Sequence, residues 1–277
     1  MSNFLQVQAL ASGSSGNSTL FRKGSTSVLV DAGLSLKSML AHLDTIGLCA
    51  DRVSGIVLTH EHGDHTSSAY SLSRKYGIPL YANRRTLTAV YRGRPETPNT
   101  VLESGACAKI GQVKVSTFPV PHDAVEPTGV CVSDDECGHK VTLITDAGHI
   151  TAEMRYHARK SNLLIVEANH DIHRLSSGPY PGPLKARILS DRGHLSNEAA
   201  VGLICHLVAD QGPLTVWLAH LSKENNTPKL ALGYARATVS VLTGCPLVID
   251  VAKRDKPSAK WTPRSHALQL SLFANAS

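Results

Sequence analysis

Thr59-His60-Glu61-His62-Gly63-Asp64-His65 places three histidines and one aspartate within six residues, directly after the apolar run Gly55-Ile56-Val57-Leu58. A short apolar run that ends in a polar turn predicts a buried strand with functional side chains at its C-terminal edge. In an extended or loop conformation, His60 and His62 point the same way. Two imidazoles can therefore converge on one cation.

The rest of this motif offers ligands for a second cation. Asp64 and His65 come one step further along the chain. Imidazole nitrogen together with carboxylate oxygen suits zinc, manganese or iron, and a site with open positions for water is catalytic rather than structural. The alternative is a surface loop that happens to be rich in histidine. The dense spacing and the ligand-type residues elsewhere in the chain disfavour it.

The length and composition are those of a globular chain. Its 277 residues can form one large domain or two small ones, and without a linker-like segment or internal repeat we predict one domain over residues 1–277. The N-terminus lacks the features of a secretory signal, and no segment approaches the length of a membrane span. The six scattered cysteines form no Cys-x-x-Cys pair and are expected to be reduced. We therefore predict a cytoplasmic protein without a membrane partner.

The formal net charge is +6 and the isoelectric point is about 9.0. This balance fits an anionic partner, but many globular proteins are equally basic. It gains weight if Asp64 and Asp146 bind metal, because the field around the site is then more positive than the count suggests.

Strand-like runs outnumber helical ones along the chain. Two packed sheets with helices outside fit this pattern better than a singly wound parallel sheet, although periodicity alone does not decide between them. Strands are expected at 5–10, 18–21, 27–30, 78–82, 113–120, 129–132, 141–145, 163–166 and 214–220. Helices are expected at 36–46, from the histidine motif to 76, at 197–209 behind a Ser196 cap, and at 228–241 behind Thr227.

Three later strands each end in a ligand-type residue. These residues are His122, Asp146 and His220. A lone histidine at a strand end is more often not a ligand. The order and strand-end placement of all three, behind the histidine motif, make a shared metal site the better interpretation.

Together these motifs resemble the metallo-β-lactamase superfamily. The resemblance implies an α/β fold, a four-layer αββα sandwich of two mixed β-sheets flanked by helices, with a binuclear site at one edge. It implies that one metal is bound by His60, His62 and His122, that the other is bound by Asp64, His65 and His220, and that Asp146 bridges the two with a water or hydroxide. Sharing a carboxylate and a hydroxide lowers the repulsion between two cations, and the hydroxide becomes a nucleophile at neutral pH.

The motifs also narrow the branch of the superfamily. A histidine rather than a glutamate at position 62 disfavours the diiron oxygen-reducing members, and His65 without a ligand cysteine disfavours a true β-lactamase. Glyoxalase-type thioesterases share the first motif. The segment from His122 onward looks more like the phosphodiesterase and nuclease members. Among these, the RNA-processing β-CASP group is disfavoured because its insert does not fit a chain of this length. The transfer-RNA-trimming enzymes are disfavoured because no equivalent of their long arm is found.

The most specific resemblance is to the bacterial YycJ-like family, also called WalJ or VicX. It rests on residues 11–17, 30–35, 122–127, 167–171, 193–198 and 219–226. This family implies metal-dependent 5′-to-3′ exonuclease activity on DNA. The sequence departs from the family at Ala168 and Gly182, and the basic tail from Lys253 onward matches no motif and has no predicted function.

Further residues are candidates for substrate contact. The loop Ser12 to Asn17 offers amides and hydroxyls that can cradle a phosphate, with Ser14 and Asn17 as contacts, or it is an ordinary hairpin turn. His194 precedes a helix N-terminus and can bind the scissile phosphate or protonate the leaving oxygen. The alternative is that His194 has a structural role and bonds to the backbone.

Three other polar residues have weaker assignments. His170 and Asn225 are candidate substrate contacts, with structural roles as the alternative, and for Asn225 the turn is favoured. Asp31 is expected to orient a ligand histidine or a loop rather than to bind metal. The motif from Tyr180 to Lys185 has no predicted chemical role.

The sequence thus predicts a binuclear phosphodiesterase, most specifically a 5′-to-3′ DNA exonuclease that contains two Zn²⁺ or Mn²⁺ ions. The predicted catalytic residues are Asp64, Asp146 and His194. One alternative is a hydrolase of a small ester, thioester or β-lactam at the same metals. Another is a catalytically silent binding member, which the complete ligand set disfavours. DNA is the predicted partner; protein partners are not predicted.

Overall fold

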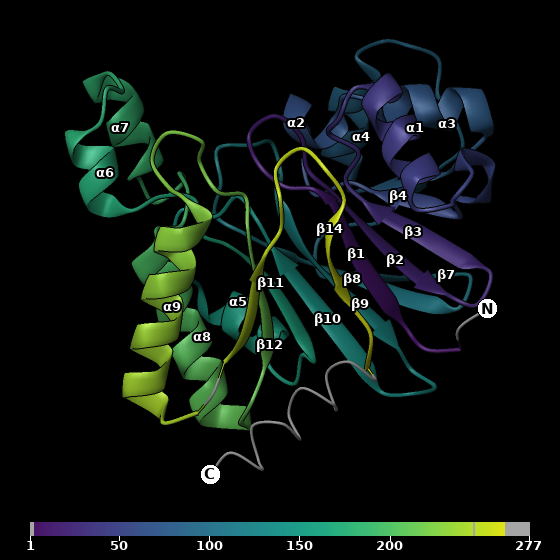
Figure 1. The fold of residues 1–277 in the computed structure, drawn as a ribbon. Helices are drawn as coiled ribbons and strands as arrows, with labels where there is room; N and C mark the ends of the chain where they lie inside the picture. Colours follow the sequence, from purple (N-terminus) through teal and green to yellow (C-terminus); the bar gives the residue numbers. More distant parts are fainter. Residues whose placement is uncertain (1–2, 246, 264–277) are drawn as a thin grey trace.

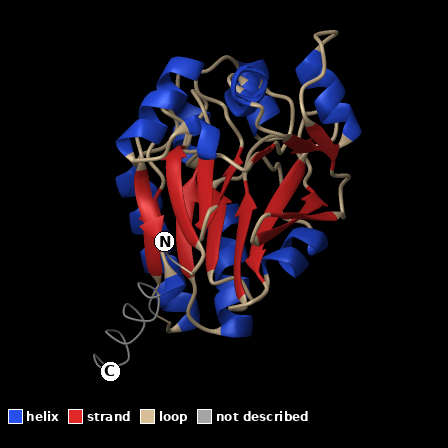
Figure 2. Cartoon of the chain, turned by 90° about the vertical axis from the view of Figure 1, so that its right-hand side faces the viewer, coloured by secondary structure: helices blue, strands red, loops and turns tan. Residues whose placement is uncertain are grey.

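The computed structural model describes residues 3–245 and 247–263. Two seven-stranded sheets pack against each other, and helices cover their outer faces (Figures 1 and 2). This arrangement is the predicted four-layer sandwich of two mixed sheets.

The first sheet has the strand order β14-β1-β2-β3-β4-β5-β6. Neighbours from β14 to β3 are antiparallel, and those from β3 to β6 are parallel. Its strands are β1 (Gln6–Ala11), β2 (Ser18–Lys23), β3 (Thr26–Val30), β4 (Gly55–Val57), β5 (Leu80–Ala82), β6 (Asn99–Val101) and β14 (Ser258–Trp261).

The second sheet has the order β13-β12-β11-β10-β9-β8-β7. Strands β10 to β13 are parallel, and β7 to β10 are antiparallel. Its strands are β7 (Cys107–Ile110), β8 (Val113–Pro119), β9 (Thr128–Asp134), β10 (His139–Ile144), β11 (Leu163–Glu167), β12 (Thr215–Ala219) and β13 (Val248–Val251).

The helices divide between the two outer faces. The described helices are α1 (Leu36–Thr45), the 3₁₀ turn η1 (Ala50–Arg52), α2 (Gly63–Thr66), α3 (Ala69–Tyr76), α4 (Arg84–Tyr91), α5 (Ala152–Ala158), α6 (Ile172–Ser177), α7 (Gly182–Ile188), α8 (Asn197–Gln211) and α9 (Pro228–Thr243). Helices α1, α3 and α4 pack on the first sheet, and α5, α8 and α9 pack on the second (Figure 1). Helices α6 and α7 form a separate pair at one end of the sheets.

Three apolar layers hold the sandwich together. Leu72 and Leu87 pack with Ile56 between the helices and the first sheet, and a second cluster fills the space between the other sheet and its helices. Val57 and Ile165 belong to the cluster between the sheets. Because β11 and β12 are buried on both faces, they carry continuous apolar runs rather than alternating ones.

The two long helices begin where the sequence predicts. The Ser196 side chain accepts a hydrogen bond from the Ala199 amide, and Thr227 does the same for Leu230, with Pro228 at the first helical position. The single helix expected behind the histidine motif is instead two, α2 and α3. The short helices α4 to α7 are absent from the sequence-based expectation.

The segment from Lys253 onward is only partly a tail. Residues Ser258–Trp261 form β14, which pairs with β1 at the edge of the first sheet, and Trp261 is buried. The sequence assigned no function to this stretch, and its role here is structural, because a strand that completes a sheet edge needs no sequence motif. The remainder of the predicted tail, from residue 264, lies outside the described residues. No helix in the described ranges is long and apolar enough to span a membrane.

Candidate metal centre

The predicted ligands meet at one end of the sandwich. They follow β4 (the motif from His60 to His65), β8 (His122), β10 (Asp146) and β12 (His220). The carboxyl ends of parallel strands open at the same edge of a sheet. Both sheets therefore contribute side chains to the same end, where α2 and the α6–α7 pair also lie (Figure 1).

Three site residues turn the chain sharply behind their strands. Asp31, Asp146 and His220 have φ values of 62°, 56° and 52°. The left-handed region costs a non-glycine residue roughly 1–2 kcal/mol. Such conformations cluster at functional sites, where the surrounding structure holds them in place.

The first group of ligands contains His60, His62 and His122. Nε2 of His60 lies 3.1 Å from Nδ1 of His62. One nitrogen from each of the three rings lies within 4.8 Å of the other two. His60 and His122 are buried, and His62 is half-buried. This group can hold one cation by nitrogen ligands alone.

The second group contains Asp64, His65 and His220. Oδ2 of Asp64 lies 3.6 Å from Nε2 of His65 and 3.5 Å from Nε2 of His220. The three ligand atoms again lie within 4.8 Å of one another. This group offers two nitrogens and a carboxylate oxygen.

Asp146 lies between the two groups. Its Oδ2 is 2.9 Å from Nε2 of His65, and its Oδ1 is 3.9 Å from Nε2 of His122. It also forms a possible ligand cluster with His60 and His65. A carboxylate in this position can reach toward a cation in either group.

Oxygen partners fix the orientation of four of the imidazoles. Nδ1 of His60 lies 3.0 Å from Oγ1 of Thr59, and Nδ1 of His65 lies 2.8 Å from Oδ2 of Asp31. Nδ1 of His122 lies 3.0 Å from the carbonyl oxygen of Gly193, and Nδ1 of His220 lies 2.7 Å from Oε1 of Glu167. When Nδ1 is held by an oxygen, Nε2 is left to face the centre, as in metal sites generally. The predicted role of Asp31 agrees with its contact to His65.

Several buried polar atoms at the centre make no hydrogen bond within the described part of the chain. Oδ2 of Asp146 and Nε2 of His220 are two of them, and each has only an ion-pair contact, with Nε2 of His65 at 2.9 Å and with Oδ2 of Asp64 at 3.5 Å. A buried polar group without a hydrogen bond is costly. A divalent cation would satisfy both atoms, so the residues present fit a metal.

Two groups at the centre are already in the form that binds metal. Burial and the neighbouring His65 hold the pKa of His60 well below its ordinary value, which keeps a lone pair available for a metal. Burial opposes the charged form of Asp146, yet His220 and His65 hold its pKa well below the ordinary range. Neutral imidazole and ionised carboxylate are the forms that bind metal.

Glu167 is a site residue that the sequence reasoning missed. It is fully buried, and its Oε1 lies 2.7 Å from Nδ1 of His220 and 2.9 Å from Nδ1 of His194. Its other oxygen accepts hydrogen bonds from the amides of Ala147 and Leu195. Although burial favours the neutral acid, His194 and His220 lower the pKa of Glu167 to about 2. Its position at the end of a predicted strand was the available signal.

His194 lies beside these two ligand groups and forms a further possible ligand cluster with Asp146, Glu167 and His220. Its Nδ1 is 3.3 Å from Oδ1 of Asp146, and its side chain keeps 19% of its surface exposed. Burial lowers the pKa of His194, but Glu167 and Asp146 raise it, to about 11. Cations at the centre would offset part of this effect because they neutralise Asp146. The imidazole can therefore carry a proton beside the two candidate ligand groups.

The loop from Ser12 to Asn17 is mostly a brace. Oγ of Ser12 accepts a hydrogen bond from the amide of His220 at 2.7 Å, and Nδ2 of Asn17 lies 3.0 Å from Nε2 of His65. The amides of Gly13, Gly16 and Asn17 bond within the loop or to Asp64. The phosphate-cradle interpretation is therefore wrong for these three amides, because their hydrogens are already used. Ser14 remains exposed.

The other two predicted substrate contacts are buried. Asn225 has no exposed surface, and its amide nitrogen lies 3.4 Å from Oγ of Ser222, as expected of a residue that shapes the turn. His170 is 1% exposed, and neither ring nitrogen bonds to a described residue. Neither residue joins the metal-ligand groups, and their substrate contacts stay predictions.

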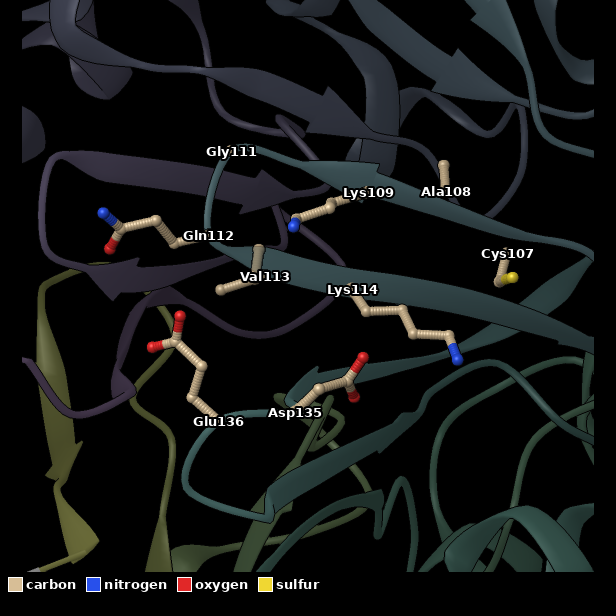
Figure 3. Close-up of a pocket in the computed structure, with 9 residues that line it drawn as sticks. All are labelled: Cys107, Ala108, Lys109, Gly111, Gln112, Val113, Lys114, Asp135 and Glu136. Atoms are coloured by element: carbon tan, nitrogen blue, oxygen red, sulfur yellow. The ribbon is translucent and has the colours of Figure 1, made fainter.

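Two cavities differ in their relation to this centre. One, of about 240 Å³, is lined by His194, Ser14 and residues of α7. Another of similar volume lies at the β7–β8 hairpin and is lined by Cys107, Lys109, Lys114 and Glu136 among others (Figure 3). It contains none of the predicted site residues. The cavity at His194 is therefore the one that adjoins the candidate chemistry.

Comparison with known proteins agrees with this geometry. The family model described as the β-lactamase superfamily domain matches residues 26–220. The chain belongs to the metallo-β-lactamase superfamily. Its relatives include exodeoxyribonuclease YycJ of Bacillus anthracis, 37% identical over 230 residues that make up 82% of this chain and 86% of that protein. Exodeoxyribonuclease WalJ of Streptococcus pneumoniae is 38% identical over 80% of this chain and 83% of its own.

Solved structures show the same superfamily fold. The metallo-β-lactamase fold protein YhfI of Bacillus subtilis superposes with a TM-score of 0.71, covering 94% of this chain and 99% of its own at 17% identity. The predicted fold and the predicted resemblance to the YycJ and WalJ proteins are thereby confirmed. The predicted enzyme class, a metal-dependent hydrolase, follows from membership in this superfamily.

Proposed function

We propose that this chain is a binuclear metal-dependent phosphodiesterase that removes nucleotides from the 5′ end of DNA. The observation that carries the proposal is the position of Asp146 between two complete ligand groups. The relatives named exodeoxyribonuclease support DNA as the substrate. The 5′-to-3′ direction and a cytoplasmic location rest on the family resemblance and on the sequence.

The ligand assignment follows the geometry of the two groups. His60, His62 and His122 would hold one ion, Asp64, His65 and His220 would hold the other, and Asp146 would contact both. Zn²⁺ and Mn²⁺ both suit this mixture of nitrogen and oxygen ligands. When bound, the two ions supply a nucleophile at neutral pH and stabilise negative charge on the phosphate.

The protein itself would supply the proton for the leaving group. Hydrolysis forms one phosphorus–oxygen bond, breaks another, and leaves an alkoxide that needs a proton. His194 is held through Nδ1 by Glu167, so its Nε2 is the atom that can donate. Burial lowers the pKa of His194, but Glu167 and Asp146 raise it, which favours the protonated ring that a general acid requires. The proton that the attacking water loses would restore the protonated ring, and Glu167 would stabilise its positive charge.

The test uses the purified full chain, stripped of metal. The protein is incubated with double-stranded DNA labelled at one end or the other, and Mn²⁺ or Zn²⁺ is added back. We expect stepwise loss of nucleotides from the 5′ end that depends on metal. His62→Ala should abolish it, whereas His206→Ala, which removes an exposed histidine on α8, should not.

The same preparations separate this function from its alternatives. Intact DNA in the presence of fully metallated protein would overturn the nuclease proposal. Hydrolysis of nitrocefin or a thioester by that protein would then assign the centre to small-molecule substrates. Loss from the 3′ end would retain the nuclease and correct its direction.

A further inference from the structure

The cavity beside His194 has two walls of different origin. The α6–α7 pair and its connecting turn contribute Tyr180, Leu184 and Arg187. The loops around the metal centre contribute His194, together with Ser14, Asn169 and Ser222. The first wall therefore combines apolar surface with one cation, and the second is polar and includes the carboxylate of Asp123, which pairs with Arg187. At about 240 Å³, the cavity lies below the range of roughly 300–1,000 Å³ typical of pockets for drug-sized ligands.

The wall formed by α6 and α7 is fastened to the metal-centre loops. Nη2 of Arg174 donates to the carbonyl of Glu224 at 3.1 Å. Nζ of Lys185 donates to the carbonyl of Ser176 at 2.8 Å, which ties α7 to α6. The wall is thus a fixed part of the site, and what it presents to the cavity is preorganised.

Tyr180 is the aromatic residue of this wall. It stands between Pro179 and Pro181 in the turn that joins the two helices. Proline fixes its own φ and restricts the residue before it, so the backbone on both sides of Tyr180 has little freedom. An aromatic ring that lines a cavity on a restricted backbone can serve as a stacking platform for a flat ligand.

Arg187 gives the same wall a positive charge. Its Nε donates to Oδ2 of Asp123 at 2.6 Å, and its Nη groups make no hydrogen bond to the described residues. Its side chain keeps 57% of its surface exposed. A guanidinium with free Nη groups is well suited to a phosphate, which it can bind through two parallel hydrogen bonds.

We propose that this cavity binds the terminal nucleotide of the DNA strand, with the base against Tyr180 and a phosphate at Arg187. The proposal rests on the proposed function. His194 links the two sites, because it lines the cavity and also lies 3.3 Å from Asp146. A nucleotide in the cavity would have its linkage to the next nucleotide at the metals. The motif around Tyr180 thereby acquires a role in selecting a strand end.

The first test measures steady-state kinetics on end-labelled DNA for Tyr180→Ala, Tyr180→Phe and the control Tyr156→Ala. Tyr156 is 70% exposed on α5, away from the cavity. Removing one base–aromatic stack should raise KM about tenfold with little change in kcat. Phenylalanine should retain the wild-type KM, and so should the control. An unchanged KM in Tyr180→Ala would overturn the proposal.

The second test changes the substrate and so needs no folding control. DNA whose terminal nucleotide lacks its base should bind the wild type about tenfold more weakly, because the stack is lost. For Tyr180→Ala, loss of the terminal base should not weaken DNA binding any further, because both changes remove the same interaction. Equal losses in both proteins would place the base elsewhere.

The third test concerns the phosphate. Arg187→Ala should weaken binding and reduce the salt slope of binding by about one. Arg159→Ala is the matched control, because Arg159 pairs with Asp210 on the surface and lines no described cavity. A wild type that degrades no DNA would overturn the proposed function. A wild type that degrades DNA, with an unaltered salt slope in Arg187→Ala, would overturn the subsite alone.

Discussion

Glu167 holds His220 through a hydrogen bond of 2.7 Å between Oε1 and Nδ1. The same carboxylate oxygen lies 2.9 Å from Nδ1 of His194. One buried side chain therefore orients a predicted metal ligand and the predicted general acid. The position of the predicted proton donor relative to the predicted metal ligands depends on this carboxylate.

Glu167→Gln should lower metal affinity about 10- to 100-fold, the range seen when an outer partner of a ligand histidine is removed. The amide keeps the shape of the side chain but loses the negative charge that stabilises both rings. Competition with a chromophoric chelator measures the affinity. Glu153→Gln, at an exposed carboxylate on α5, is the control. Equal affinities for the two variants would contradict a role for Glu167 in the centre.

Metal binding should release protons from the metal-free protein. Burial lowers the pKa of His65, but Asp146 and Asp31 raise it well above the ordinary value, so the ring is protonated at neutral pH. A metal ligand must give up that proton. Titration with Zn²⁺ in weak buffer containing an indicator dye measures the release.

Asp31→Asn should reduce this proton release at neutral pH. Removing one of two carboxylates lowers the pKa of His65, so fewer rings carry a proton before metal binds. Asparagine tolerates the left-handed backbone at position 31, where φ is 62°, so the fold should survive. Wild-type and variant proteins that release the same number of protons would show that Asp31 does not set the charge of His65.

Gly33→Ala should destabilise the protein and empty its second metal position. An added Cβ would lie 1.6 Å from the carbonyl oxygen of Asp64, a backbone atom that must then move. We expect a loss of about 2–3 kcal/mol in the free energy of unfolding, as for overpacked cores. Gly202→Ala, within α8 and with no atom near the added Cβ, should instead be neutral or stabilising by about 0.5–1 kcal/mol. Urea unfolding and metal analysis measure the two effects.

A buried ion pair far from the metal ligands should make stability depend on pH. Lys23 and Asp134 are 2% and 0% exposed and are hydrogen-bonded to each other. Burial raises the pKa of Asp134, but Lys23 and nearby backbone amides bring it below the ordinary 3.8. The pair's contribution is therefore present above the pKa of an unfolded aspartate and is lost as the pH falls through the lower folded value.

Lys23→Met should cost about 1–3 kcal/mol at neutral pH, because Asp134 is left without its charged partner. The difference from wild type should shrink as the pH falls below about 4, where the carboxyl becomes protonated. The double variant with Asp134→Leu should recover part of the loss. Urea unfolding at several pH values measures this, and a difference that does not change with pH would show that the pair contributes no charge interaction.

The sequence by itself determined which ligand-type side chains the motif behind β4 contributes to the candidate metal centre. The spacing of His60, His62, Asp64 and His65 is local, so a few residues behind one strand suffice to present these side chains. The starts of α8 and α9 were predictable for the same reason, because Ser196 and Thr227 cap amides only three residues away. Local geometry needs no knowledge of the rest of the chain.

Only the tertiary structure decided which residues support the ligands. Ser12 accepts a hydrogen bond from the backbone amide of His220, which lies 208 residues away in the sequence. Glu167 contacts the imidazole ring of His220 from another strand. The closure of the first sheet by β14 and the cavity at Tyr180 likewise arise between distant segments. A polar or small residue carries no sign of its distant partner in its own neighbourhood, because packing creates that partnership only when the two sheets come together.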